Sequence, residues 1–129
     1  MRERTFDIYE RTFQFACRVL RMDRALVRDR RVNRRAMNQL VDAAGSVGAN
    51  LEEARAGQSK ADFYSKLRIS LKEARESHYW LRLLRESESI SAKRIDPLLA
   101  EASEIVAILT TIAKKANPQN TKRKPILNS

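Results

Sequence analysis

Residues 39–84 read QLVDAAGSVGANLEEARAGQSKADFYSKLRISLKEARESHYWLRLL and predict two helices joined at a single glycine. Gly57 occupies the position at which a glycine commonly ends a helix. Ser59, with Asp62 three residues later, has the capping-box pattern that starts the next helix. A connection this short requires the two helices, residues 34–56 and 60–86, to form an antiparallel hairpin.

Both helices of the hairpin have apolar residues at helical spacing. In residues 34–56 these are Met37, Leu40, Ala44, Val47, Leu51 and Ala54. In residues 60–86 one row contains Phe63, Leu67, Ser70, Ala74, Ser77, Leu81 and Leu84, and an adjoining row contains Ile69, Glu73, Glu76, Trp80 and Leu83. Gly45 and Gly48 each cost roughly 0.5–1 kcal/mol inside a helix. We therefore expect either a close approach by a neighbouring helix at these glycines or a kink.

Two further helices flank the hairpin. Residues 5–26 carry one row of Phe6, Tyr9, Phe13, Ala16 and Leu20 and a second row of Phe15, Val19, Met22 and Leu26, a face broad enough for a bundle. Asn33 is the expected cap of the helix that follows. Asp96 and Pro97 predict the start of the last helix, residues 97–116, because aspartate caps helices and proline favours their first position.

Four amphipathic helices with short connections predict an all-α fold, an antiparallel up-down-up-down four-helix bundle. With 129 residues the chain has room for one domain, which we place at residues 1–117. Residues 118–129, PQNTKRKPILNS, are expected to be a basic, flexible tail. In this topology the connection after the first helix and the tail lie at opposite poles of the bundle.

The net charge of +10 is concentrated in two places. Residues 1–35 hold 11 arginines and five acidic residues, whereas residues 36–113 hold 10 basic and 11 acidic residues. Residues 114–129 hold five basic residues and no acidic one. A basic excess of this kind favours an anionic partner, which is RNA, DNA, an acidic protein or a membrane surface. The candidate nucleic-acid-binding residues are Arg28, Arg30, Arg31, Arg34 and Arg35 in the first connection and Lys122, Arg123 and Lys124 in the tail.

Helix 34–56 also contains the residues by which the chain resembles a known family. It has a glutamine, small residues and a Ser-Val-x-Ala-Asn-Leu-x-Glu run, at Gln39, Ala43, Ala44, Ser46, Val47, Ala49, Asn50, Leu51 and Glu53. Ser59, Asp62 and Phe63 follow, and then a Leu-Lys-Glu-Ala-x-Glu-x-x-Tyr-Trp-Leu-x-Leu-Leu run at residues 71–84. Residues 101–105 and 108–110 match in the last helix. Ala54 departs from the pattern, which often has glycine there.

Over residues 6–115 the chain thus resembles the 23S rRNA intervening-sequence proteins, small bacterial four-helix bundles. The resemblance implies a homopentameric ring. It also implies similarity to the accessory proteins of diversity-generating retroelements, which work with a reverse transcriptase and RNA.

From the residues themselves, Asn50 and Glu53 are polar where the pattern indicates partial burial, and Glu73 and Glu76 border the apolar face. Buried polar groups need partners, so we expect Asn50 and Glu53 to bond across to helix 60–86 or to an arginine of a neighbouring subunit.

No catalytic, cofactor or metal site is predicted. His78 is the only histidine, and it lies five residues after Glu73 and two after Glu76, which does not give the Glu-x-x-His spacing of di-metal bundles. The chain has no glycine-rich phosphate loop and no serine in a nucleophile elbow. A single cysteine, Cys17, excludes an intramolecular disulfide and fits a cytoplasmic protein. No apolar run approaches the length of a membrane span, so no membrane partner is expected.

Two functions fit these observations. The first is a non-enzymatic homo-oligomer that binds nucleic acid, RNA above all, through basic poles, as an accessory subunit of a reverse transcriptase. The alternative is a scaffold whose basic poles dock an acidic protein without binding nucleic acid.

Overall fold

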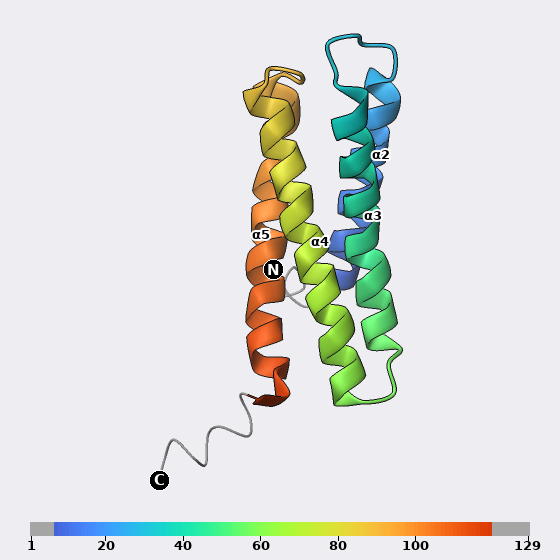
Figure 1. Ribbon diagram of the computed structural model, residues 1–129, viewed down its shortest axis with the longest axis vertical. Coiled ribbons are helices and arrows are strands. Elements are labelled where there is room, and N and C mark those ends of the chain that lie inside the picture. The colour runs from blue at the N-terminus through green and yellow to red at the C-terminus, as the bar shows by residue number, and fades with distance from the viewer. Residues whose placement is uncertain (1–6, 120–129) are drawn as a thin grey trace.

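The computed structural model describes residues 7–119 and contains, within them, four helices and no strand. They are α2 (Ile8–Leu26), α3 (Arg34–Arg55), α4 (Lys60–Glu86) and α5 (Ala92–Ala116). Neighbours in sequence pack side by side and α5 closes the bundle against α2, with the most extensive contact between α3 and α4. The connections 27–33 and 87–91 lie at one end and 56–59 at the other (Figure 1). The predicted up-down-up-down bundle is confirmed.

Side-chain caps fix where three of the helices begin. The Asn33 side chain accepts a hydrogen bond from the Ala36 backbone N–H at 2.9 Å, and Ser59 Oγ accepts one from the Asp62 N–H at 3.1 Å. Both caps were predicted, and α4 begins and ends where the sequence places it. Each cap satisfies an N–H group that the first helical turn leaves without an intrahelical partner.

The predicted start of α5 is wrong. The helix begins at Ala92, capped by Ser91, whose Oγ accepts from the Arg94 N–H at 3.4 Å. Pro97 therefore lies inside the helix, and Asp96 bonds to Arg85 through its carboxylate instead of capping. The physical reason is burial: Ile95 is completely buried, and extending the helix to Ala92 fixes it on the core face. Proline has no backbone N–H, so Pro97 cannot donate a hydrogen bond to the carbonyl four residues earlier. That carbonyl belongs to Lys93, which is exposed.

The ends of α3 and α4 differ in their use of glycine. Gly57 has no positive φ, so it does not act as the left-handed cap that the sequence suggests. A Cβ at Gly57 would instead lie 3.1 Å from the Ala54 carbonyl oxygen, so the residue serves close packing. At the end of α4, Glu88 has φ 62°, with its N–H donating to Arg85 O and the next N–H, of Ser89, to Leu84 O. This is a Schellman motif with glutamate at the usual glycine position.

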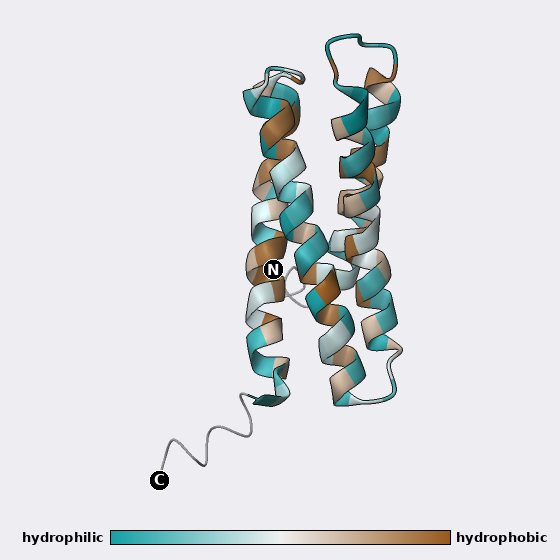
Figure 2. Cartoon of the chain, viewed as in Figure 1, coloured by the Kyte–Doolittle hydropathy of each residue, from teal (hydrophilic) through white to brown (hydrophobic). Residues whose placement is uncertain are grey.

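The core is formed along the inner face of all four helices, and hydrophobic and hydrophilic residues alternate along each of them (Figure 2). The predicted row of α3 is buried throughout, and so is the first row of α4 apart from the partly buried Phe63. The adjoining row of α4 is not buried, because Ile69 and Leu83 are exposed. The second row of α2 is buried at Phe15, Val19 and Met22. The first row of α2 is wrong in part: Phe13 is 59% exposed and Leu20 is 54% exposed. The core face of α2 instead includes Ile8 and Thr12. Phe6 lies outside the described residues.

Small side chains bring α3 close to both of its neighbours. A Cβ at Gly48 would lie 3.4 Å from Thr12 Oγ1, so the predicted close approach occurs there, against α2. A Cβ at Gly45 would meet nothing within 4 Å, so no helix within residues 7–119 approaches that residue closely. On the other side, the buried Ser70 Oγ of α4 donates to the Val47 carbonyl of α3 at 2.7 Å. This bond satisfies a hydroxyl that would be costly to bury without a partner.

Candidate nucleic-acid interface

The arginine-rich connection 27–33 is held to the connection 87–91 by one serine. Ser89 Oγ accepts from the Asn33 backbone N–H and donates to the Arg31 carbonyl, each at 2.8 Å. Ser89 is buried, and Val32 and Ile90 beside these bonds are buried as well. The arginines before and after this point are therefore presented on a fixed backbone.

Two of the five predicted arginines are neutralised within the chain. Arg31 forms an ion pair with Asp29 at 2.9 Å, and Arg34 with Asp23 on α2. The hydrogen bonds from Arg31 lower the pKa of the Asp29 carboxyl, so this pair stays ionised at neutral pH. The remaining three, Arg28, Arg30 and Arg35, are exposed and form no ion pair within residues 7–119. These three are the arginines of the connection that are best placed to bind an anion.

Three more arginines, which the sequence did not predict as part of the site, lie next to this pole. Arg18 and Arg21 of α2 and Arg94 of α5 line a groove of about 330 Å³ together with Met22, Pro97 and Leu98. None of the three forms an ion pair within the described part of the chain. Arg94 is 59 positions after Arg35, and only the antiparallel topology brings them to one end. We call Arg18, Arg21, Arg28, Arg30, Arg35 and Arg94 the arginine pole.

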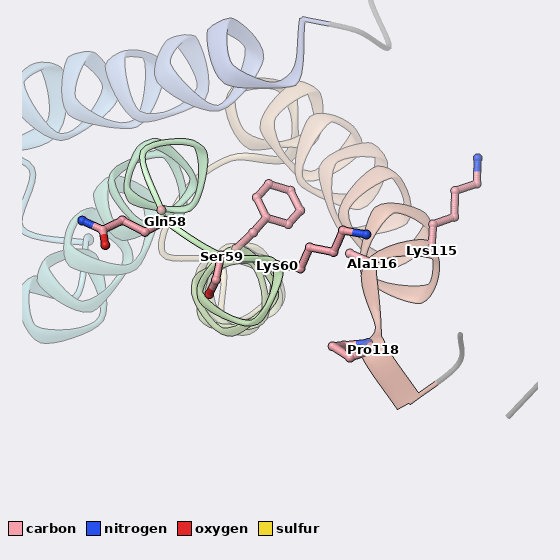
Figure 3. Close-up of a pocket in the computed structure, with 8 residues that line it drawn as sticks. Gln58, Ser59, Lys60, Lys115, Ala116 and Pro118 are labelled. Carbon is pink, nitrogen blue, oxygen red and sulfur yellow. The ribbon is translucent and has the colours of Figure 1, made fainter. Parts of the chain in front are cut away.

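The opposite pole has a second groove, between the start of α4 and the end of α5. It measures about 680 Å³ and has an apolar base that includes Phe63 and Ala116. Figure 3 shows Lys60 extending from α4 toward the last turn of α5, whereas Lys115 points away from the bundle. The predicted tail residues Lys122, Arg123 and Lys124 lie outside the described residues.

The four predicted polar positions are divided between α3 and α4. Glu53 forms an ion pair with Lys66 of α4 at 2.8 Å, so it bonds across the hairpin as expected, but its side chain is 60% exposed and the predicted partial burial is wrong. Asn50 instead donates to the Ser46 carbonyl of its own helix at 2.9 Å. A half-buried asparagine inside a helix can donate to the carbonyl four residues earlier, and the row pattern alone does not reveal this local bond.

Glu73 and Glu76 lie on the side of α4 that faces α3. Burial, and then the charge of Glu76, raise the pKa of Glu73. Glu76 Oε2 accepts from the Trp80 indole N–H at 3.4 Å.

Burial lowers the pKa of His78 on the other side of α4, and the charge of Arg82 adds to that effect. Within residues 7–119 no three His, Cys, Asp or Glu side chains gather in a way that could hold a metal ion.

Within residues 7–119, no helix combines the length and the hydrophobicity that a membrane span requires.

Comparisons with known proteins identify relatives of the chain. The family model for the 23S rRNA-intervening sequence protein matches residues 4–111. Among solved structures, the chain is similar to a protein of unknown function from the S23 ribosomal protein family of Bacteroides thetaiotaomicron. The two are 34% identical with a TM-score of 0.77, over 83% of this chain and 98% of that chain. No functionally curated protein matches the chain.

Proposed function

The chain belongs to the 23S rRNA-intervening sequence protein family, and we propose that it is a non-enzymatic homo-oligomer that binds nucleic acid through its basic poles. The observation that carries this proposal is the arginine pole, where six exposed or groove-lining arginines have no ion pair within the described residues. Arginine offers a planar fork of donors that matches phosphate oxygens, and several such contacts together supply sequence-independent affinity. RNA is the first partner to test, because the family is named for an RNA insertion.

Exposed apolar side chains support the homo-oligomer. Phe13 and Leu20 lie in one row on α2, and Val27, directly after the helix, has the same spacing; the three are 59%, 54% and 57% exposed. Ile69 and Leu83 are exposed on α4. Two unlike apolar surfaces on one chain suit a head-to-tail contact, which closes into a ring when the rotation between copies allows it. We propose the pentamer that the family resemblance implies.

Light scattering tests the oligomer directly. We expect a particle of about five times the 14.9 kDa chain mass, and we expect Phe13→Asp with Leu20→Asp to dissociate it because both side chains would then be charged. A monomeric wild-type protein at micromolar concentration would refute this part of the proposal.

Nucleic-acid binding is tested by comparing two double variants with equal loss of charge. Arg30→Gln with Arg35→Gln removes two unpaired charges from the arginine pole, whereas Arg55→Gln with Lys66→Gln removes two charges that are held in ion pairs. With a labelled RNA, the slope of log K against log salt should fall by about 1.4 for the first variant if the RNA is single-stranded. The second variant should change it far less. Equal slopes would contradict the role of the pole.

A reverse transcriptase is the protein partner that we propose on the strength of the family resemblance. Co-purification of the enzyme with the tagged chain, persisting after nuclease treatment, would support it. The second candidate function, docking of an acidic protein, is favoured by the groove at the opposite pole, which combines Lys60 and Lys115 with an apolar base. Capture of an acidic partner by a chain that binds no RNA or DNA would select this alternative.

A further inference from the structure

A row of cations runs along the outer surface of α4. Arg68, Lys72, Arg75 and Arg82 are all exposed, and Tyr79, which is 54% exposed, lies among them. The five residues are spaced by four, three, four and three positions, which places them on one face of the helix. At 1.5 Å per residue the row from Arg68 to Arg82 is about 21 Å long. We call these five residues the α4 stripe.

The charge of the stripe is only weakly compensated within the described chain, where Lys72 lies near enough to Glu73 to act on its pKa. None of its four cations forms an ion pair with another of residues 7–119. The acidic residues of the neighbouring helix are engaged elsewhere: Asp96 accepts from Arg85, and Glu101 and Glu104 both accept from Arg11 of α2. On the same helix, Glu73 and Glu76 lie on the α3 side, where Glu76 bonds to Trp80. The stripe is therefore a continuous positive surface at the waist of the bundle.

Shallow grooves beside the stripe could receive a chain-like ligand. One groove of about 470 Å³ lies against Arg68, Lys72 and Arg75. A second, of about 200 Å³, is lined by Arg75, His78, Ser103 and Val106, which joins the stripe to α5 without any acidic side chain. At the N-terminal end, the Arg68 guanidinium lies 5.7 Å from the Tyr64 ring centroid, so an aromatic ring is available there too.

We propose that the α4 stripe binds the backbone of single-stranded nucleic acid, with Tyr79 as a platform for an unstacked base. This inference rests on the proposed function and assigns it a site separate from the arginine pole. A linear row of cations matches a linear polyanion, and exposed aromatic rings among cations are the arrangement that binds single strands without sequence preference. A double helix does not offer its bases for stacking, so Tyr79 distinguishes the two forms. An acidic peptide would use the charges but not the tyrosine.

The test measures binding of a fluorescent oligouridine of about 15 nucleotides and of an RNA duplex of the same length, each over a salt series. For the single strand, Arg68→Gln with Arg75→Gln and Arg82→Gln should lower the slope of log K against log salt by about 2. Tyr79→Ala should weaken single-strand binding at least about fivefold, leave duplex binding unchanged, and be rescued by Tyr79→Phe. All of these side chains are exposed, and circular dichroism should show an unchanged helical bundle.

The outcomes separate this inference from the proposed function. If the stripe variants bind oligouridine with wild-type affinity and slope while the arginine-pole variant is weakened, the stripe proposal is wrong and the proposed function stands. If wild-type protein binds neither probe at low salt, the proposed function fails and the stripe proposal fails with it. A third outcome is that Tyr79→Ala has no effect and that the triple variant loses as much affinity for a poly-glutamate peptide as for oligouridine. The stripe would then be a general anion-binding surface, and the proposal would be overturned.

Discussion

Arg11 is expected to provide the strongest polar link between α2 and α5, the two neighbouring helices that share the least contact. Its Nε donates to Glu101 Oε2 at 3.0 Å, and its Nη2 donates to Glu101 Oε1 at 2.8 Å and to Glu104 Oε1 at 2.6 Å. The Arg11 and Glu101 side chains are only 16% and 20% exposed. The hydrogen bonding that Arg11 donates to the Glu101 carboxylate is the main reason that the pKa of Arg11 is raised.

The expected coupling energy of Arg11 and Glu101 is about 2 kcal/mol. Charge-assisted hydrogen bonds contribute about 1.5–3 kcal/mol each when well formed, and removing one partner of a buried pair costs about 3–5 kcal/mol. Partial exposure lowers both figures. Arg11→Ala should therefore cost at least about 2 kcal/mol, because Glu101 is left half-buried without its bidentate partner, and should lower Tm by roughly 8 °C for a chain of this size.

A double-mutant cycle measures the coupling. Arg11→Ala, Glu101→Ala and the double variant are unfolded in urea at one fixed protein concentration, because an oligomer's stability depends on concentration. The matched control is Arg55 with Glu52, the same two residue types at 2.9 Å but 52% and 57% exposed. That pair should couple by about 0.3–0.5 kcal/mol. A coupling for Arg11 and Glu101 no larger than that of the control would refute the argument that burial strengthens this link.

Three further predictions concern stability, measured by thermal or urea unfolding. Gly45→Ala should stabilise the chain by about 0.5–1 kcal/mol because a Cβ there meets nothing within 4 Å. Gly57→Ala should destabilise it by about 1 kcal/mol because the new Cβ would lie 3.1 Å from a carbonyl oxygen. A Gly57→Ala variant more stable than Gly45→Ala would contradict the packing described. Ser89→Ala should cost about 1–3 kcal/mol by leaving the Asn33 N–H without its acceptor, and an unchanged unfolding midpoint would show that the serine is not an anchor. The pKa of Glu73 is raised in the folded state, so the ionised carboxylate opposes folding and stability is lost as pH rises through the folded pKa. Glu73→Gln should thus stabilise the chain by a few tenths of a kcal/mol at pH 7 and by nothing near pH 3; a gain that is equal at both pH values would exclude the charge as its cause.

Local signals in the sequence predicted the hairpin well, because they act over three or four residues. Asn33 and Ser59 cap the helices that they were predicted to cap, and α4 has the predicted bounds. The start of α5 was missed because two local signals competed. Asp96 with Pro97 has a strong start pattern, but Ser91 also caps, and the burial of Ile95 decides between them. Burial depends on the other three helices, so no local pattern contains it.

The face of α2 could not be fixed from its own residues either. Two apolar rows were present, and both fit a helical period. The structure buries Phe15 and Val19 and leaves Phe13 and Leu20 exposed. An isolated bundle requires one row only, so the second row is an excess of apolar surface that the fold does not use. Such an excess is what a contact between copies would bury, which is why the same ambiguity supports the oligomer proposal.

The α4 stripe shows that the distribution of charge along the sequence does not reveal every basic surface of the fold. Residues 36–113 have a net charge near zero, so the sequence alone favours the two ends of the chain as basic surfaces. A helix, however, sorts residues by angle and not by position. The acidic residues Glu73 and Glu76 lie on the side of α4 that faces α3, while Arg68, Arg75 and Arg82 lie on the other side at intervals of seven. A neutral segment can therefore present a strongly basic face, and the four-three spacing of the cations, visible in the sequence, was the signal that could have found it.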